Sequence, residues 1–451
     1  NITIKDINDL VKLNKKLNFK LKLRGPDNTN IKKIKNYTFI HNLLHITGNK
    51  TIQPFTNNEE DIICVFNGEI YNYKKFEDLF KKKYGSDGEC LIDLYSNYGE
   101  NFTKYIHGEF AIVLLDLKKG KMIISSDIFS TKPLYMQSDK DNFAISTYKY
   151  ALNELGFSIN NAYKIEANTI LSYDLEKHTF SYIGKVYDFK LKQYKNNFND
   201  FNKTLLKTFK MMADRENVFI TMSSGYDSGA IACGLNKLNT NFNSYSSYEG
   251  EDKKIIDSRF SKLKNNPISN VSCKVFNITN NDKTTIKMDI LGKIDKFNSY
   301  LDYERTKPYN ILNDNATFGI GYLFKKAKDD GCKIHLSGQG ADEIFSDYGF
   351  NGNKLKSHSC FGGKFPSNLE SIFPWFSFYK GTQECFINKE EHVAGCYGIE
   401  NRYPFLDKNV VQEFLYLSPN LKNKFYKAPL YNFLKLYNFP FKENEKKGFT
   451  C

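Results

Sequence analysis

Residues 217–232 have the sequence NVFITMSSGYDSGAIA, which passes from an apolar run into small residues. The run at 217–222 predicts a buried strand, and the residues after Gly225 predict the first turns of a helix. A short turn of serine and glycine separates the two. The order strand, glycine-containing turn and helix is typical of a parallel sheet with helical crossovers. This stretch therefore predicts an α/β fold for its part of the chain.

The same order of elements recurs at 333–345, with the sequence KIHLSGQGADEIF. A short apolar strand again runs into a glycine-containing turn and a helical pattern. Because the carboxyl ends of parallel strands share one edge of a sheet, we expect both turns to face the same site.

The first half of the chain has a different pattern, with short β-rich runs separated by turns. The stretch 110–126 predicts a hairpin that turns at 118–120, where Lys-Lys-Gly separates two apolar strands. Further β-rich runs lie at 39–46, 61–73, 143–147 and 169–175. This half is therefore expected to be dominated by strands.

A chain of 451 residues is too long for one ordinary hydrophobic core, so its length favours two domains. The hydrophobic fraction of 41% and the aromatic fraction of 15% argue for globular domains rather than disorder. A polar stretch without apolar periodicity lies at 190–202. We expect one domain at 1–190, a linker at 191–202 and a second domain at 203–451.

The net charge of +13 comes mainly from Lys residues scattered among Asn, Ile, Tyr and Phe. Runs of basic residues interleaved with aromatics are missing, which favours a solvated basic surface over a nucleic-acid partner. The nine cysteines form no CxxC pair, so we expect reduced thiols in a cytoplasm. No apolar stretch approaches the roughly 18 to 20 residues that span a bilayer, and we recognise no signal peptide, so no membrane partner is expected.

The turn at 223–228, Ser-Ser-Gly-Tyr-Asp-Ser, has the composition of an anion-binding loop. Backbone N–H groups at a helix N-terminus favour phosphate oxygens. The hydroxyls of Ser223, Ser224 and Ser228 add donors, and Asp227 can hold a magnesium ion that bridges phosphates. The Gly-Lys-Ser/Thr ending of a Walker loop is missing. By itself, the turn is equally consistent with an ordinary strand-to-helix connection.

This loop resembles the PP-loop, SGGxDS, of enzymes that cleave ATP between its α and β phosphates and form an adenylate, with Ser224 in place of a glycine. The turn at 337–343 resembles the SGEGADE segment of asparagine synthetases, with Gln339 in place of a glutamate. A carboxylate there could accept a proton from attacking ammonia, and an amide cannot. The segment ENRYPFLD at 400–407 resembles their ExRxPFLD segment, and KKGF at 446–449 resembles their KxGF segment.

The resemblance implies a C-terminal PP-loop α/β domain, of the adenine nucleotide α-hydrolase type, that uses ATP and Mg²⁺. Asp227 and Asp342 would bind the metal and, together with Lys446, neutralise the departing pyrophosphate during catalysis. For 400–407 we expect a buried turn with an internal Glu–Arg pair. The residues implied for ATP and pyrophosphate binding are Ser223, Ser224, Gly225, Asp227, Ser228, Ser337 and Gly338.

In the first half, RGPD at 24–27, FNGEIYN at 66–72 and GSDGE at 85–89 resemble segments of class II glutamine amidotransferases, in the same order. The resemblance implies an Ntn-type antiparallel αββα sandwich. The residues implied for a glutamine site are Asn67 and Gly68, which would line an oxyanion site, and Glu69 and Asp87, which would hold the amino group and backbone of glutamine.

Two positions depart from that resemblance. The glutaminase of this class uses an N-terminal Cys whose own α-amino group is the base, whereas the sequence begins with Asn1, so we expect either missing residues before Asn1 or a decayed glutaminase. Leu43 stands where an Arg would bind the glutamine carboxylate. Decay of this kind resembles the β-lactam synthetases and lasso-peptide cyclases, and both explanations stay open.

The sequence therefore predicts an ATP-dependent carbon–nitrogen ligase that forms AMP and pyrophosphate. Ammonia or an amine would attack an acyl-adenylate, with aspartate to asparagine as the default reaction and glutamine as nitrogen donor only if a Cys precedes Asn1. Three alternatives stay open: a same-fold enzyme that amidates or cyclises another carboxylate, a PP-loop enzyme that modifies tRNA, and a non-catalytic nucleotide-binding scaffold. A homodimer is also left open.

Overall fold

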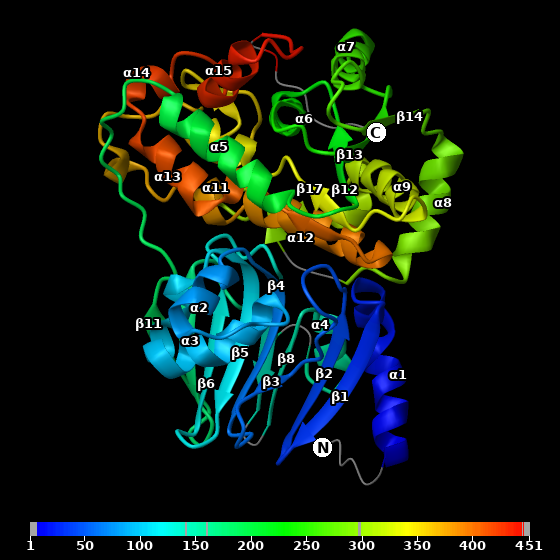
Figure 1. Cartoon of the computed structure of the whole chain (residues 1–451), viewed down its shortest axis with the longest axis vertical. Coiled ribbons are helices and arrows are strands. Elements are labelled where there is room, and N and C mark those ends of the chain that lie inside the picture. The colour runs from blue at the N-terminus through cyan, green and yellow to red at the C-terminus, as the bar shows by residue number, and fades with distance from the viewer. Residues whose placement is uncertain (1–6, 140–141, 159–160, 296–298, 444, 446–451) are drawn as a thin grey trace. The chain divides into compact units, whose positions relative to one another are not determined.

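The computed structural model describes residues 7–139, 142–158, 161–295, 299–443 and 445. The chain divides into two compact units (Figure 1). The first contains Asn1–Asp188 and Ile294–Phe297, and the second contains Phe189–Lys293 and Asn298–Cys451.

The stretch predicted as a linker, 191–202, is packed within the second unit. The backbone N–H groups of Tyr194 and Lys195 both donate to the carbonyl of Tyr416 at 2.9 Å. Helix α5 (Asn199–Met212) already begins inside this stretch. Backbone hydrogen bonds to a distant helix end therefore order a segment whose polar composition suggested a free connection.

An antiparallel six-stranded sheet forms the centre of the first unit. The predicted hairpin at 110–126 is confirmed, because Asp116 pairs with Lys121 across the turn. The strand order is β11-β10-β6-β5-β4-β3. The bounds are β3 (Phe55–Thr56), β4 (Ile62–Ile70), β5 (Gly108–Asp116), β6 (Lys121–Ser126), β10 (Thr169–Asp174) and β11 (Thr179–Gly184).

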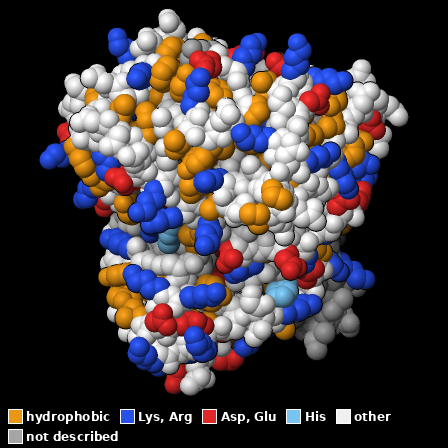
Figure 2. All heavy atoms as spheres, turned by 45° about the horizontal axis from the view of Figure 1, so that its top comes forward, with side chains coloured by type: hydrophobic (Ala, Val, Ile, Leu, Met, Phe, Trp, Pro, Cys, Tyr) orange, Lys and Arg blue, Asp and Glu red, His pale blue; other side chains and the backbone are white. Residues whose placement is uncertain are grey.

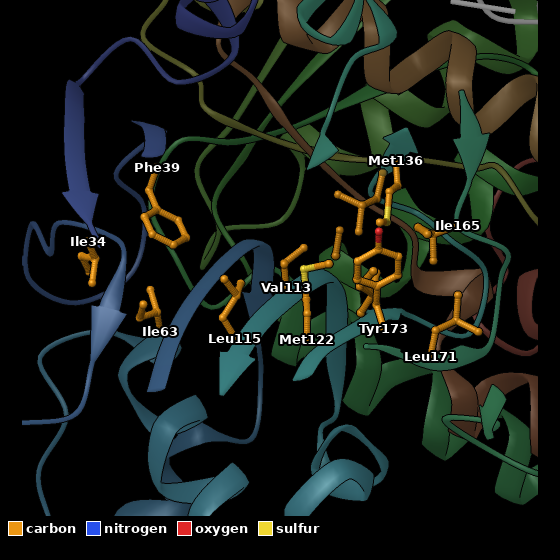
Figure 3. Packing of buried hydrophobic residues seen from close by; sticks show 13 residues of the cluster. Ile34, Phe39, Ile63, Val113, Leu115, Met122, Met136, Ile165, Leu171 and Tyr173 are labelled. Carbon is orange, nitrogen blue, oxygen red and sulfur yellow. The ribbon is translucent and has the colours of Figure 1, made fainter. Parts of the chain in front are cut away.

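Smaller sheets pack on one face of this sheet. Figure 3 shows the apolar core between them, in which Ile34 and Phe39 lie nearest to Ile63 and Leu115 of the large sheet. One small sheet pairs β1 (Asn28–Ile34) with β2 (Tyr37–Leu43). The other contains β7 (Tyr135–Ser138), β8 (Phe143–Ser146) and β9 (Tyr163–Lys164).

Helices cover the outer faces of the first unit. α1 (Ile7–Arg24) and α4 (Lys149–Glu154) contact the small sheets, whereas α3 (Cys90–Tyr98) contacts β4 of the large sheet and α2 (Tyr73–Phe80) packs on α3. The residues of β5 are buried on both faces, as expected for a strand inside a layered fold. The predicted αββα sandwich is therefore confirmed.

The second unit contains a parallel five-stranded sheet in the order β14-β13-β12-β17-β20. In β12 all residues except Thr221 are buried, the pattern of a strand covered on both faces. The predicted α/β domain is thus confirmed. The strands are β12 (Val218–Met222), β13 (Phe242–Ser247), β14 (Val271–Phe276), β17 (Ile334–Leu336) and β20 (Glu400–Arg402).

Two groups of helices pack around this sheet, and both contact β12. The first group contains α5, α6 (Tyr226–Lys237), α13 (Lys408–Tyr416) and α15 (Ala428–Leu436), and the second contains α8 (Asn280–Leu291), α9 (Asn315–Asp329) and α12 (Thr382–Tyr397). The other elements of the unit are α7 (Lys253–Lys264), α10 (Ala341–Phe345), α11 (Phe376–Tyr379), α14 (Pro419–Lys422), β15 (Ser299–Tyr300), β16 (Pro308–Tyr309), β18 (Gly349–Phe350) and β19 (Asn353–Lys354).

The strand order brings the two predicted turns together. β12 and β17 are neighbours in the sheet, with Val218 paired to Ile334 and Phe219 to His335. Because both strands run in the same direction, the turns that follow them leave the same edge. We therefore expect a functional site at this edge of the sheet.

The surface gives no sign of a concentrated basic region on the face drawn in Figure 2, where Lys and Arg side chains are spread among acidic and apolar ones. Within the described ranges, the helices are too short or too polar to cross a membrane.

Candidate functional site

Hydrogen bonds within the turn after β12 set its shape. The Ser223 N–H donates to Ser228 Oγ at 3.0 Å, and the Gly225 N–H donates to Ser223 Oγ at 3.2 Å. Gly225 is extended and caps α6 without a side chain. The serine hydroxyls therefore close the loop and leave its backbone at the start of a helix, where partial positive charge favours anions.

A carboxylate already lies against this loop. Glu251 Oε2 accepts the N–H of Ser224 at 2.6 Å and also its hydroxyl. A backbone N–H and a hydroxyl thus converge on one anionic oxygen. The loop has the donor arrangement that a phosphate oxygen requires.

The turn after β17 lies beside the first turn. A Cβ atom added at Gly338 would lie 3.0 Å from Asp227 Cβ, which is tighter than ordinary contact. The Ser337 N–H donates to the carbonyl of Arg402 at 2.9 Å and fixes the turn to β20. A side chain at position 338 would press on Asp227, so glycine favours the close approach of the two turns.

Lys427 joins the acidic residues of the two turns. Its Nζ lies 2.7 and 2.8 Å from the two carboxylate oxygens of Asp227 and 2.9 Å from Asp342 Oδ1. The Tyr426 hydroxyl donates to the same Asp342 oxygen at 2.7 Å. An ammonium therefore bridges two carboxylates that are 115 positions apart in the sequence, from 227 to 342.

Burial and charge act on Lys427 in opposite directions. Its side chain is 2% exposed, and burial alone would lower its pKa. The charges of Asp227 and Asp342 outweigh burial and hold the pKa of Lys427 above its ordinary value. The backbone of Lys427 has a φ of 46°, a left-handed conformation that side-chain-bearing residues adopt only where the surroundings impose it. The site therefore contains a fixed positive charge.

The two aspartates fit a magnesium ion of the kind that binds with a nucleotide. Mg²⁺ is usually held by one or two carboxylates plus substrate phosphates. Asp227 and Asp342 supply such oxygens around one cationic position, and their side chains are 21% and 11% exposed. Within the described residues, no cluster of three or more metal-ligating side chains was found, so a metal here would depend on phosphate oxygens.

Arg259, on α7, contacts the turn after β12 through the backbone carbonyl of Ser223. Its Nη1 donates to the carbonyl of Ser223 at 2.5 Å and its Nε to the carbonyl of Pro440 at 2.8 Å. The side chain is fully buried, and a Cβ atom at Gly229 would collide with the guanidinium. Gly229 therefore makes the space that lets Arg259 reach the turn.

The turn after β17 contains a second acid, Glu343, which directly follows Asp342 and has different partners. Glu343 accepts the Tyr348 hydroxyl at 2.6 Å and the Gly340 N–H at 3.2 Å, which stabilises the start of α10. Burial raises the pKa of Glu343 to about 7. Its bonds indicate a structural role.

The segment at 400–407 forms the buried turn that the sequence predicts. Arg402 Nε donates to Glu400 Oε1 at 2.8 Å, and its Nη1 donates to the carbonyl of Met212 at 2.8 Å. Arg402 is 1% exposed. The predicted Glu–Arg pair is confirmed as a structural feature.

The predicted glutamine-site residues lie together in the first unit. Asn67, Gly68 and Glu69 belong to β4, and the Ile70 N–H of this strand donates to Asp87 Oδ2 at 2.8 Å. Glu69 Oε1 accepts the Thr47 hydroxyl at 2.7 Å. Among described residues, Asn67 Nδ2 is buried without a hydrogen-bond partner.

The structure explains why position 68 is a glycine and what the Asp of the RGPD segment contacts. Gly68 has a φ of 141°, and a Cβ atom there would collide with the Glu109 carbonyl. Asp27 Oδ2 accepts the His45 N–H at 2.8 Å, which ties RGPD to the end of β2. These features fit an amidotransferase-like scaffold, and they also explain the sequence pattern without catalysis.

Sequence reasoning placed a lysine in the phosphate site but chose Lys446, which lies outside the described residues. It missed Lys427, which the structure places against Asp227 and Asp342. One signal was available: Lys427 directly precedes a helix with Pro429 at its start, where a cation opposes the helix dipole. A cation in that place needs an acidic partner.

The chain matches two domain families. Residues 3–210 match the glutamine amidotransferase domain family, and residues 201–376 match the asparagine synthase family. Together these matches span residues 3–376, which is nearly all of the first unit and part of the second.

The chain is similar along most of its length to two named enzymes. It is 24% identical to asparagine synthetase B (glutamine-hydrolysing) of Escherichia coli, over 92% of this chain and 74% of that protein. It is 25% identical to asparagine synthetase (glutamine-hydrolysing) 2 of Oryza sativa, over 90% of this chain and 66% of that protein. Among solved structures, glutamine phosphoribosylpyrophosphate amidotransferase of B. subtilis has a TM-score of 0.31 and 12% identity, covering 58% of this chain and 78% of its own.

Proposed function

We propose that this chain is an enzyme of the asparagine synthetase type, in which the second unit activates a carboxylate with ATP and transfers the acyl group to ammonia or an amine. The observation that carries this proposal is the meeting of Asp227, Asp342 and Lys427 beside the anion-binding loop. The reaction class is ATP-dependent amide formation with release of AMP and pyrophosphate.

The residues of the site would bind the phosphates and neutralise charge during ATP cleavage. Backbone N–H groups of the 223–228 loop bind phosphate oxygens at the start of α6, displacing Glu251 from Ser224. A substrate carboxylate oxygen attacks the α-phosphorus and pyrophosphate leaves. Lys427 supplies a preorganised positive charge near the leaving group. Asp227 and Asp342 would hold magnesium, which neutralises phosphate charge when bound.

Lys446 keeps the role that the sequence resemblance gives it, as a second positive charge for pyrophosphate. Lys262 Nζ donates to the carbonyls of Tyr437 at 3.3 Å and Asn438 at 2.5 Å, and Arg259 binds that of Pro440. The segment just before Lys446 is thereby tied to α7, whose residues also reach the loop.

We infer that aspartate is the default carboxylate and ammonia or an amine the nucleophile. Leu43, in place of the expected Arg, removes a positive charge that the glutamine carboxylate needs. Cys64 and Cys90 are buried, and burial raises the pKa of both thiols, so neither is suited to act as a nucleophile. The eight described cysteines are free thiols.

The second candidate is an enzyme of the same fold that acts on another carboxylate or uses an internal amine. Gln339 favours it, because the family segment has a glutamate at that position. Carboxylate-dependent ATP–pyrophosphate exchange over a panel of amino acids and dicarboxylic acids separates the two. Exchange with aspartate alone supports asparagine formation, exchange with another acid supports the second candidate, and no exchange with any acid contradicts both.

A further inference from the structure

A buried carboxylate stands beside the turn after β17, on a different element from the residues considered so far. Glu390 belongs to α12 and is 5% exposed. Its Oε2 accepts the Ser337 hydroxyl at 2.5 Å, and its Oε1 accepts Gln339 Nε2 at 3.2 Å. Both donors therefore come from the turn itself.

The Glu390 carboxylate lies close to the proposed phosphate site. Gly338, between the two donors, packs on Asp227, so the turn borders the proposed phosphate site. Gln339 cannot accept a proton at neutral pH, because an amide is not basic. Its Nε2 points to Glu390, so a carboxylate is still present next to this position although the side chain at 339 is an amide.

We propose that Glu390 accepts the proton that the attacking amine releases during amide formation. The inference rests on the proposed function. The amine nitrogen forms a C–N bond with the acyl carbon, and the C–O bond to the phosphate of the adenylate breaks. AMP leaves with that electron pair, and one N–H proton passes to Glu390. Ser337 and Gln339 are positioning residues that hold its two oxygens.

The surroundings of Glu390 suit this task. Burial raises its pKa to about 7, while the charge of Lys389 lowers it and that of Glu391 raises it. A general base is most effective when its pKa lies near the operating pH. At pH 8 Glu390 is therefore largely ionised, and below pH 6 it is largely protonated.

A pair of isosteric variants tests the assignment. Glu390→Gln keeps the size and hydrogen-bonding capacity of the side chain but removes the base. Glu391→Gln is the matched control, because Glu391 is the next buried acid on α12 and instead accepts the Tyr403 hydroxyl at 3.0 Å. For each variant, ATP–pyrophosphate exchange and amide formation from ammonium chloride are measured with the panel acid that gives the strongest exchange, from pH 5.5 to 9.

We expect Glu390→Gln to keep wild-type exchange and to lose amide formation by about 100-fold or more. In the wild type, amide formation should rise through about pH 7 and exchange should not follow that rise. Glu391→Gln should keep amide formation, with the rise moved to lower pH, because the charge of Glu391 raises the pKa of Glu390. Glu390→Asp retains a carboxylate and should recover part of the rate with a displaced pH limb.

These measurements distinguish a wrong assignment of Glu390 from a wrong proposed function. If Glu390→Gln exchanges and also forms amide at the wild-type rate and pH dependence, Glu390 is not the proton acceptor. A parallel loss of exchange and amide formation in Glu390→Gln and Glu390→Asp alike would assign it a structural role instead. If the wild type shows no exchange with any acid, the proposed function itself is wrong.

Discussion

Lys427 is a buried lysine whose ammonium lies between the carboxylates of Asp227 and Asp342. We predict that Lys427→Met lowers the free energy of unfolding by about 2 to 4 kcal/mol, since both acids lose a cation at a largely buried site. ATP–pyrophosphate exchange should fall by about 100-fold or more, because one preorganised charge is removed. Denaturant unfolding and exchange assays measure the two effects.

Lys422 provides the control for this prediction. It is also a buried lysine of the second unit, and its Nζ donates to Gln193 Oε1 at 2.6 Å and to the carbonyls of Leu415 and Leu417 at 2.9 and 2.7 Å. Lys422→Met should be destabilised as well, because three acceptors lose their donor, yet folded protein should keep its exchange activity. Equal exchange activity in the two folded variants would contradict a phosphate-site role for Lys427.

The raised pKa of Glu390 predicts a pH-dependent stability. Its pKa is 4.5 in the unfolded reference and about 7 in the fold, so the folded state binds more protons between these values. The free energy of unfolding therefore falls as the pH rises through this window. Glu390→Gln removes this penalty and should be more stable than the wild type at pH 8, by roughly 1 to 3 kcal/mol, but not at pH 4.5.

Trp375 offers a direct probe of that effect. It is the single tryptophan of the chain, lies in the second unit and donates through Nε1 to the carbonyl of Glu343 at 2.8 Å. Its fluorescence during denaturant unfolding therefore reports on this unit. A stability difference between Glu390→Gln and the wild type that is the same at both pH values would rule out titration of Glu390 in this window.

At the scale of elements, α6 and α7 meet through a glycine and an arginine. Gly229→Ala should lower the free energy of unfolding by about 1 to 3 kcal/mol, because Arg259 is fixed by two hydrogen bonds and cannot move aside cheaply. The KM for ATP should rise, since Arg259 also holds the Ser223 carbonyl. Thermal unfolding and initial rates check both.

A double mutant separates this clash from other effects. Arg259→Leu removes the guanidinium that an alanine at position 229 would strike, so Gly229→Ala should cost much less in that background. Additive effects of the two substitutions on the free energy of unfolding would show that the helices are not coupled at this point.

Elements with strong periodicity were predictable from the sequence. The apolar run of β12 and the hairpin of β5 and β6 are encoded locally by buried residues and a turn, so their positions agree with expectation. The stretch 191–202 was not predictable, because its order comes from backbone bonds to Tyr416, more than 200 positions away in the sequence. Local composition does not record such partners.

In the candidate site, too, the residues of local motifs could be predicted, and those that depend on long-range contacts could not. Asp227 and Asp342 lie in local motifs and could be identified from the sequence. Lys427 directly precedes α15 and Glu390 belongs to α12, and neither lies in a motif, so only the fold brings them to the site. Serine hydroxyls were predicted as phosphate donors, yet Ser223 and Ser228 bond to each other at 2.8 Å. A hydroxyl can bond to many groups, and only the tertiary structure selects one.

At the scale of the whole molecule, the two units are expected to differ in activity. The second unit holds a connected set of charges, whereas in the first unit Leu43 stands where the resemblance implies a cation, and the thiols of Cys64 and Cys90 are buried. We predict that the chain forms amide from ammonium chloride and releases no glutamate from glutamine, with or without ATP. Enzymatic assay of glutamate is the measurement, and substantial release would show a working glutaminase despite Leu43.

In the proposed reaction, Asp227, Asp342, Lys427 and the 223–228 loop bring about the cleavage of ATP between its α and β phosphates. Mass spectrometry of the nucleotide products, with magnesium, ammonium chloride and a panel of carboxylic acids, tests it most directly. We predict AMP and pyrophosphate in equal amounts with the amide, dependent on one acid of the panel and lost in Lys427→Met. Formation of ADP and phosphate with the amide would contradict the claim.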